Sequence, residues 1–272
     1  MKRNSPNRDS TEPSHLTSES RLQTPDSSLI NIIDLTLAYG SKVIMRDLSF
    51  DVHQGEVLIF MGGSGSGKST LLKSMIGLVR PAKGHIMYGQ TDLWSAAESE
   101  QNKIRRRMGV LYQHGALWSS MTLTENIALP LEVYTDLSRA SVLELASMKL
   151  SLVGLAGQEG AYPSELSGGM QKRAALARAL ALDPEIVFFD EPSSGLDPVS
   201  SRRLDELILE LQSSMGMTMI VVTHDLDSIF TISTRALFLD PKQKTMAEIG
   251  DPRLMRDNSK NPDVREFLRR SK

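Results

Sequence analysis

The sequence predicts an α/β fold with a mainly parallel sheet at its core. Three observations predict this fold: short apolar runs of strand length, helical segments between them, and a glycine-rich loop that joins a strand to a helix. The apolar runs are EVLIFMG, IVFFD and MTMIVVTH, and a predicted helix follows each of them. That alternation is typical of parallel strands, whose crossover connections are helices. A chain of 272 residues is long enough for one such domain with appendages.

Composition divides the chain into three parts. Residues 1–28 are rich in Ser, Pro, Asn and charge, and we expect a disordered polar tail because this segment cannot bury enough apolar area to offset the entropy of ordering. The alternating pattern occupies residues 29–252, with a mainly helical subdomain at about 115–182. We expect residues 253–272 to form a short C-terminal tail, helical in the second half of NPDVREFLRRSK, that is either solvated or docked on a neighbouring subunit.

The remaining elements follow from the residues in order. Two β-rich runs open the domain, LINIIDLTLAYG and VIMRDLSFDV. Helical periodicity follows in STLLKSMIGL. It appears again in SVLELASMKLSLVGL, where either Ser138 or Ser141 can cap the helix start. A β-rich start and a helical middle therefore flank the strands of the predicted sheet.

Composition also excludes several kinds of function. Lys plus Arg number 31 against 33 Asp plus Glu, so no overall basic field attracts nucleic acid, and a bound anion needs a local site. The chain has no Cys, which excludes disulfides, thiolate metal sites and a cysteine nucleophile. No apolar run approaches the roughly 18 residues of a spanning helix, and the N-terminus lacks the apolar core of a signal peptide. We therefore expect a chain on the cytoplasmic side, whose membrane role depends on a partner that spans the bilayer.

The glycine-rich loop predicts a phosphate site. GGSGSGKS, residues 62–69, fits the pattern G-x-x-x-x-G-K-[ST] between a predicted strand and a predicted helix. Glycines let backbone N–H groups turn toward phosphate oxygens, and the helix N-terminus adds partial positive charge. Lys68 is placed to bind the β- and γ-phosphates, and the Ser69 hydroxyl to bind Mg²⁺. The alternative, a Gly/Ser-rich loop without a ligand, is disfavoured by the flanking strand and helix.

Polar residues at the ends of two later strands complete the predicted site. Asp190 ends the run IVFFD at the carboxyl edge of the sheet, where it can hold Mg²⁺ through water. Glu191 follows directly and can accept the proton of an attacking water. His224 follows MIVVT at the same edge, and its imidazole can bond the γ-phosphate, although a lone His is more often a structural residue.

A second helix start also suits an anion. Ser167 is a good N-cap, and Gly168 and Gly169 expose further N–H groups at the positive end of the helix. A merely structural cap is the alternative. The double glycine disfavours it, because glycine weakens an ordinary helix start.

The motifs GGSGSGKST, YQ, LSGGM, FFDEP, SSGLD and THD, in this order, resemble those of the nucleotide-binding subunit of an ABC transporter. The resemblance covers about residues 29–250, and LSGGM is its most specific element. It implies a P-loop NTPase ABC cassette, with an N-terminal antiparallel β subdomain and a helical subdomain beside the parallel sheet. It also implies ATP and Mg²⁺ as cofactors, and a second copy of the chain that pairs head to tail.

The same resemblance implies the site residues. Those at ATP are Tyr39, which stacks on adenine, and the loop residues Gly62, Gly63, Ser64, Gly65, Ser66, Gly67, Lys68, Ser69 and Thr70. Those implied to catalyse hydrolysis are Glu191, His224 and Gln113, and those implied around Mg²⁺ are Ser69, Gln113 and Asp190. Ser167, Gly168, Gly169 and Met170 are implied to bind the ATP of the partner chain, and Asp197 to lie at the dimer seam.

Further stretches are similar to MlaF-type ATPases, a branch that energises Mce-linked lipid transport across the bacterial envelope. They include the GALW that follows Gln113, the Met170 of LSGGM, and the terminal NPDVREFL. The similarity implies an ATPase on the cytoplasmic face of the inner membrane. Its implied partners are a MlaE-like permease, a periplasmic Mce-type lipid-binding protein and a small MlaB-like subunit.

The apolar residues after Gln113 are candidates for contact with the permease. In this family the segment forms part of a groove for a permease helix, which implies such a role for Ala116, Leu117, Trp118 and Met121. Burial of Trp118 in the core of the helical subdomain is the alternative, because large aromatic residues are usually buried.

Three other functions stay open from the sequence. They are an ABC subunit for another solute, a soluble ABC ATPase without a transport role, and a nucleotide-dependent scaffold with little turnover. A single cassette without Cys or heptads disfavours the soluble ATPase, and Glu191 disfavours the scaffold.

Overall fold

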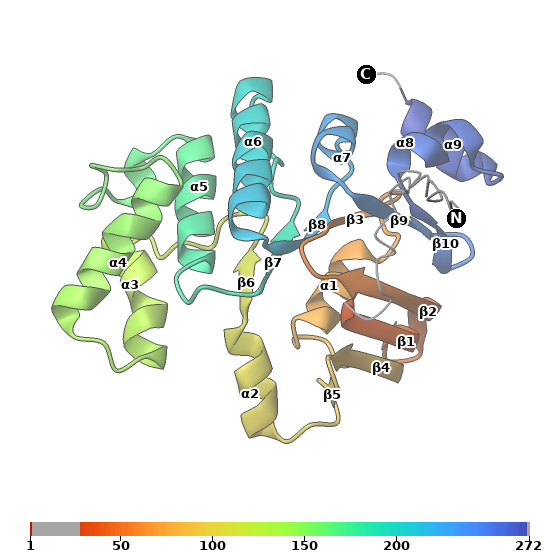
Figure 1. Cartoon of the computed structure of the whole chain (residues 1–272), viewed down its shortest axis with the longest axis horizontal. Helices are drawn as coiled ribbons and strands as arrows, with labels where there is room; N and C mark the ends of the chain where they lie inside the picture. The colour runs from red at the N-terminus through yellow and green to blue at the C-terminus, as the bar shows by residue number, and fades with distance from the viewer. Residues whose placement is uncertain (2–27, 271–272) are drawn as a thin grey trace.

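A mainly parallel sheet lies at the centre of the fold (Figure 1). The computed structural model describes Met1 and residues 28–270, and in this part of the chain the sheet has the strand order β10-β9-β3-β8-β7-β6. The strands are β3 (Val57–Met61), β6 (Met108–Leu111), β7 (Ile186–Asp190), β8 (Thr218–Val222), β9 (Arg235–Asp240) and β10 (Thr245–Gly250). All neighbouring pairs are parallel except β9 with β10. The predicted α/β fold is therefore present.

Both faces of this sheet are covered, which explains why its strands are continuous apolar runs. Every residue of β3, β7 and β8 is buried. Val57, Ile59 and Met61 of β3 belong to one buried cluster, whereas Leu58 and Phe60 belong to another. Since alternate residues of a strand point to opposite faces, the sheet separates two hydrophobic layers.

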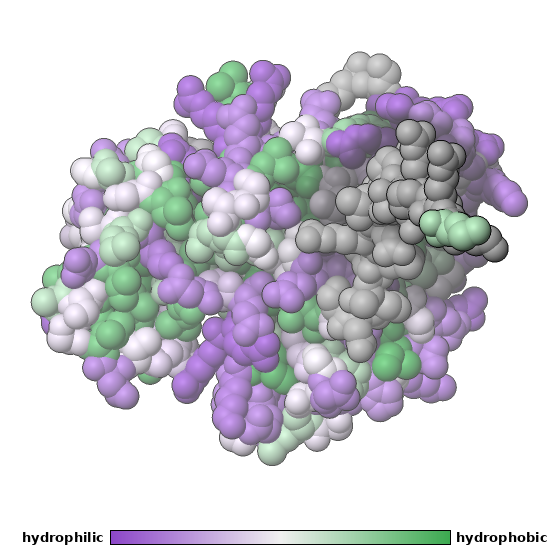
Figure 2. Space-filling view, viewed as in Figure 1, coloured by the Kyte–Doolittle hydropathy of each residue, from purple (hydrophilic) through white to green (hydrophobic). Residues whose placement is uncertain are grey.

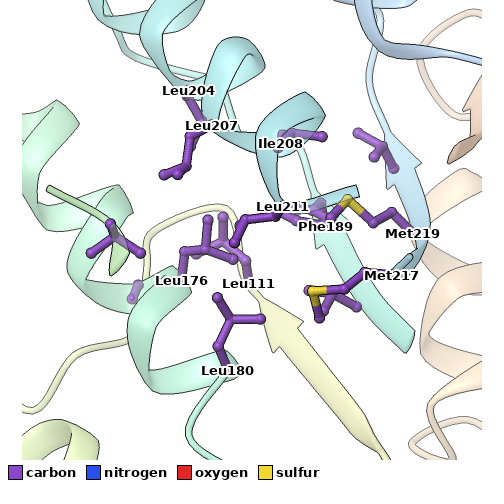
Figure 3. Packing of buried hydrophobic residues seen from close by; sticks show 14 of the residues in the cluster. Leu111, Leu176, Leu180, Phe189, Leu204, Leu207, Ile208, Leu211, Met217 and Met219 are labelled. Atoms are coloured by element: carbon purple, nitrogen blue, oxygen red, sulfur yellow. The ribbon is translucent and has the colours of Figure 1, made fainter. Parts of the chain in front are cut away.

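Helices cover the first face. They are α3 (Leu123–Tyr134), α4 (Arg139–Leu152), α5 (Gly168–Ala179), α6 (Pro198–Met215) and α7 (Leu226–Ile232), with a short 3₁₀ turn η1 (Pro163–Glu165) before α5. Figure 3 shows how α5 and α6 pack on the sheet: Leu176, Leu180, Leu204, Leu207, Ile208 and Leu211 gather around Leu111, Phe189 and Met219. Residues 115–182, for which a mainly helical subdomain is predicted, contain α3, α4, η1 and α5.

A second sheet covers the other face together with α1 (Lys68–Met75). Its strand order is β2-β1-β4-β5, and the bounds are β1 (Ser28–Tyr39), β2 (Lys42–His53), β4 (Lys83–Tyr88) and β5 (Thr91–Asp92). All its pairings are antiparallel, so the predicted N-terminal antiparallel β subdomain is present. Helix α2 (Glu98–Arg106) then leads into β6.

The caps of the helical subdomain follow local sequence. The Thr122 hydroxyl accepts a hydrogen bond from the backbone N–H of Glu125, and the Glu125 carboxylate accepts one from the backbone N–H of Thr122. This reciprocal pair fixes the start of α3. Of the two serines considered for α4, Ser138 is the N-cap, because its hydroxyl accepts from the backbone N–H of Ser141.

The C-terminal segment differs from the prediction. It forms α8 (Pro252–Asn258) and α9 (Pro262–Arg269), so the helix is not confined to the second half of NPDVREFLRRSK. Proline is favoured at the first position of a helix, and the Asn261 side chain caps α9. Neither is α9 merely solvated, because Val264, Phe267 and Leu268 are buried in the first cluster.

Two other predictions can be compared only with the residues that the structure describes. The polar tail predicted for residues 1–28 lies outside them, apart from Met1 and from Ser28, which begins β1. Within the described part, no helix combines the length and the apolar character needed to cross a bilayer.

Candidate functional site

A cavity of about 830 Å³ opens at the carboxyl edge of the central sheet. Its lining includes every residue of the glycine-rich loop from Gly62 to Thr70, together with Gln113, Glu191 and His224. These residues come from the ends of β3, β6, β7 and β8, whose parallel arrangement brings them to one edge. Open α/β sheets bind ligands at this edge.

Two glycines let the loop pass close to the sheets. Gly62 has φ of 142°, and a Cβ there would lie 2.5 Å from the carbonyl oxygen of Leu239. Gly67 has φ of 90°, and a Cβ there would lie 2.7 Å from the Met45 side chain. Any other residue at either position would clash and also adopt an unfavourable backbone conformation. The loop is therefore packed against β9 at Gly62 and against β2 at Gly67.

Lys68 begins α1 and is almost fully buried, yet its ammonium lines the cavity. Nζ donates to the carbonyl oxygens of Gly62 and Gly63, both at 3.0 Å. Burial lowers the pKa of Lys68, whereas the carboxylates of Glu191 and Asp190 act to raise it. A cation that the protein has already partly desolvated binds a phosphate strongly.

Ser69 and Asp190 form a pair of oxygen atoms suited to Mg²⁺. The Ser69 hydroxyl donates to Oδ1 of Asp190 at 2.9 Å, and the Asp190 side chain is buried at the end of β7. The described residues contain no group of three or more His, Cys, Asp or Glu that could hold a metal by themselves. Mg²⁺ needs no such group, because it binds through one or two side-chain oxygens, waters and substrate phosphates. The residues present fit this ion.

Glu191 and His224 lie next to each other in the wall of the cavity. His224 Nδ1 lies 2.9 Å from Oε1 of Glu191, and an ionised carboxylate can only accept, so Nδ1 donates. Glu191 has φ of 48°, an uncommon conformation for a side chain of this size. Its backbone N–H donates to the carbonyl of Val222 at 2.9 Å, which holds this turn against β8. Backbone strain of this kind is concentrated at functional sites.

The segment after Gln113 is fastened from α5 by residues that the sequence did not single out. Lys172 donates to the carbonyl of Gln113, and Arg178 donates to the carbonyls of Gly115 and Ala116. Ala116 has φ of 54°, so these bonds hold a strained turn. The only signal for them in the sequence is the spacing of basic residues in QKRAALAR, which a solvated helix face also shows.

Asn126 is a second residue that the sequence did not reveal. It is fully buried in α3, and its Oδ1 accepts from the backbone N–H of Trp118 at 2.8 Å. Its Nδ2 donates to the carbonyls of Trp118, Met121 and Thr122. One side chain thus holds the whole turn between Trp118 and the start of α3.

Trp118 itself is exposed, with 57% of its surface accessible. The alternative that Trp118 is buried in the core is therefore wrong. It lines a groove of about 640 Å³ together with Arg106, Val133 and Tyr134, and the Arg106 guanidinium lies 4.9 Å from the centre of the Tyr134 ring. Figure 2 shows apolar side chains gathered over α3 and α4.

The other residues predicted for this surface lie differently. Leu117 is partly buried and packs against the first hydrophobic cluster. Ala116 is exposed and Met121 half-buried, but neither lines the groove. Of the four predicted residues, the structure brings only Trp118 to the groove.

Seven of the residues predicted around the nucleotide, Mg²⁺ or the dimer seam are not in the lining of this cavity: Tyr39, Ser167, Gly168, Gly169, Met170, Asp190 and Asp197. Ser167 caps α5 by accepting from the N–H of Met170 at 3.3 Å, and Asp197 caps α6 by accepting from Val199 and Ser200. Hydrogen bonds from Ser200 lower the pKa of Asp197. Tyr39 is exposed at the hairpin between β1 and β2. None of the seven lines the cavity, although Asp190 bonds to Ser69, which does.

Comparison with known proteins adds sequence relatives. A family model described as "ABC transporter" matches residues 45–194. The chain is 42% identical over 244 residues to a protein of Mycobacterium leprae named "Probable ribonucleotide transport ATP-binding protein mkl", covering 90% of this chain and 70% of that one. It is 38% identical over 244 residues to the "Intermembrane phospholipid transport system ATP-binding protein MlaF" of Haemophilus influenzae, covering 90% and 91%.

Solved structures agree with this fold. The dimeric ATP-binding cassette MJ0796, bound to ADP and Pi in a post-hydrolysis state, is 29% identical with a TM-score of 0.73, covering 82% of this chain and 98% of that one. CbiO1 from Clostridium perfringens, part of the ABC transporter complex cbiONQ, has a TM-score of 0.77 at 24% identity, covering 84% and 90%. The second likeness concerns the fold alone.

Proposed function

This chain belongs to the ABC transporter family of ATP-binding proteins, and on that premise we propose that it energises lipid transport through an integral membrane permease. Family membership confirms the predicted ABC cassette and ATP hydrolysis as the enzymatic activity. The lipid substrate, the partners and the roles of individual residues are the proposal.

Lys68 and the loop N–H groups hold the phosphates of ATP, and the residues around the cavity divide the chemistry. Ser69 and Asp190, with Gln113, hold Mg²⁺, which neutralises phosphate charge when bound. Glu191 accepts a proton from the attacking water, and the His224 N–H keeps the Glu191 carboxylate oriented. The Glu191–His224 distance of 2.9 Å is the observation that supports this assignment best.

A second copy of the chain completes the site. Ser167, Gly168, Gly169 and Met170 begin α5 away from the cavity of their own chain, so they contact the nucleotide held by a partner. Their N–H groups and the α5 helix dipole then face phosphate charge from the opposite side. Asp197 lies at the seam. The dimeric state of the related cassette supports this arrangement.

The support for a lipid substrate is the extent of similarity to proteins named for intermembrane phospholipid transport. One match covers 90% of this chain and 91% of the relative, at 38% identity. The relatives named for ribonucleotide transport are 42% identical but extend further, since the match covers 70% of one of them. Ribonucleotide transport is therefore the second candidate.

The permease docks in the groove lined by Trp118, Val133 and Tyr134. These exposed apolar side chains suit an amphipathic helix of the partner. A MlaE-like permease, a periplasmic Mce-type lipid-binding protein and a small MlaB-like subunit complete the complex. The chain then lies at the cytoplasmic face of the inner membrane and is held there by the permease.

The substrate is tested by purifying the chain with a co-expressed MlaE-like permease and measuring phosphate release in lipid nanodiscs. We expect co-purified phospholipid by mass spectrometry and turnover that rises with phospholipid. Stimulation by ribonucleotides, without bound lipid, would replace the lipid proposal with the second candidate. The matched variant Lys68→Ala should bind no ATP in a nucleotide titration; retained affinity would overturn the assignment of the loop.

A further inference from the structure

Helix α9 reaches the nucleotide cavity, although it belongs to none of the motifs that predicted the site. Phe267 and Arg270 line the same cavity as Lys68, Glu191 and His224. They also line a second, smaller cavity of about 200 Å³, which likewise has Gly63 of the loop in its wall. The C-terminal end of α9 therefore lies beside the start of the glycine-rich loop.

The position of α9 is set by packing. Phe267 is buried and meets Phe238 of β9 edge to face, with ring centres 5.4 Å apart. The next residue of that strand, Leu239, has the carbonyl oxygen against which Gly62 is packed. One strand thus supports both the loop and α9, which places α9 next to the loop without a direct bond between them.

Arg270 presents a guanidinium whose contacts with the described residues are weak. Its side chain is 62% exposed, with the Glu266 carboxylate at 3.7 Å and the centre of the Phe267 ring at 5.7 Å. Exposed ion pairs of this kind contribute little free energy, so a stronger anion can take over the guanidinium. A guanidinium can bind two phosphate oxygens at once. The exposed Glu266 carboxylate, at 3.7 Å, makes no such paired contact with Arg270.

We propose that Arg270 is a nucleotide-binding residue that contacts the terminal phosphate of ATP. The assignment to that phosphate rests on the proposed function, since Glu191 and His224, at the hydrolysed end, line the same cavity. Arg270 then makes the site favour a nucleoside triphosphate over a diphosphate. It also couples α9 to the presence of the γ-phosphate, because Phe267 anchors the same helix to β9.

The test measures the affinity of the full chain for ATP, ADP and AMP by calorimetric titration, in wild type and in Arg270→Ala. We expect the ATP affinity to fall about threefold to tenfold and the ADP and AMP affinities to change little. Arg270→Glu should lower ATP affinity further. The difference between wild type and Arg270→Ala should shrink at 1 M salt, because the contact is exposed.

Arg269→Ala is the matched control. Arg269 is the preceding residue of α9 and carries the same charge, but its Nε donates to the carbonyl of Arg256 and it lines neither cavity. Its loss should leave all three affinities at the wild-type value. Thermal unfolding of each variant checks that α9 stays docked.

The outcomes separate this inference from the proposed function. Wild type that binds ATP and Lys68→Ala that does not, with Arg270→Ala indistinguishable from Arg269→Ala, would overturn the inference alone. Equal losses for ATP, ADP and AMP would also overturn it, since they indicate a change in cavity shape. Unchanged affinity with weakened ATP-dependent dimerisation would overturn it as well and move Arg270 to the dimer seam. Wild type without ATP binding would instead reject the proposed function.

Discussion

Glu191 combines the two properties expected of a catalytic base in this cavity. Its carboxylate is largely shielded from solvent, with 16% of the side chain exposed, and the His224 imidazole holds it by a hydrogen bond. Its backbone has φ of 48°, in the left-handed region, and the residue lines the same cavity as the glycine-rich loop. Such a conformation persists only where the surroundings hold it, here through the bond to Val222.

We therefore expect Glu191→Gln to lower the rate of ATP hydrolysis by about 10²-fold or more, because the amide cannot accept the proton of water. ATP affinity should stay within about twofold, since the phosphate contacts of Lys68 are unchanged. Phosphate release and nucleotide titration check the two parts. Glu185→Gln is the control, because Glu185 pairs with Arg107 on the surface. Equal hydrolysis rates in wild type and Glu191→Gln would reject Glu191 as the base.

At the scale of elements, the contact between α6 and α7 contains a buried acid. Asp205 of α6 is 5% exposed, and Ser228 of α7 donates to its carboxylate at 2.8 Å. Burial raises the pKa of Asp205 to about 6, and the nearby carboxylates of Asp225, Asp227 and Glu206 add to the increase. The folded chain thus favours the protonated acid more than the unfolded chain does.

The raised pKa of Asp205 sets the direction in which the stability of the fold changes with pH. The contribution of Asp205 to the free energy of unfolding is fully present below about pH 4 and is lost as the pH rises through about 6. We expect Asp205→Asn to remove this dependence and to be more stable than wild type by about 2 kcal/mol at pH 8. Urea unfolding between pH 4 and 8 measures it, with the exposed Glu210→Gln as control. The prediction would be contradicted if the free energies of unfolding of wild type and Asp205→Asn differed by a constant amount between pH 4 and 8.

Trp118 and Asn126, on either side of the turn before α3, have different expected roles. Trp118 is expected to contact the permease, whereas Asn126 holds the turn in place. Trp118→Ala should change the free energy of unfolding by less than about 1 kcal/mol, because the side chain is exposed. It should still lower permease binding and permease-stimulated hydrolysis, measured by co-purification and phosphate release. Asn126→Ala is the contrast: its buried amide has four backbone partners, so its loss should cost about 2–3 kcal/mol. Wild-type permease binding by Trp118→Ala would remove Trp118 from the docking surface.

At the scale of the whole molecule, the α5 start and the nucleotide cavity lie on different parts of one chain. In the proposed function, Ser167 completes the cavity of a second chain. We expect ATP to convert Glu191→Gln from monomer to dimer in light scattering, because unhydrolysed nucleotide keeps the two chains together. The added variant Ser167→Arg should block the dimer through steric and charge conflict at the seam and leave the ATP affinity of the monomer intact. A dimer that forms equally well with Ser167→Arg would place the interface elsewhere.

Much of the fold was predictable because its signals are local. The alternation of apolar strands with helices predicted the parallel sheet, and β3, β7 and β8 match the predicted runs closely. The predicted start of α9 was wrong for a local reason. Asn261 caps the helix and Pro262 begins its first turn, whereas the basic residues that follow do not indicate a helix start there. Burial of that helix against Phe238 depends on a residue about thirty positions earlier, and no periodicity within the segment predicts it.

The sequence by itself determined the predicted phosphate loop, because Gly62 to Ser69 are consecutive and one loop conformation brings them all to the lining of the same cavity. The tertiary structure decided which distant groups join them. Ser69 meets Asp190 across 121 positions, Arg178 holds the turn at Ala116, and Arg270 reaches the cavity only through the docking of α9. The physical reason is that strand order and helix packing, rather than chain connectivity, set distances between residues far apart in sequence.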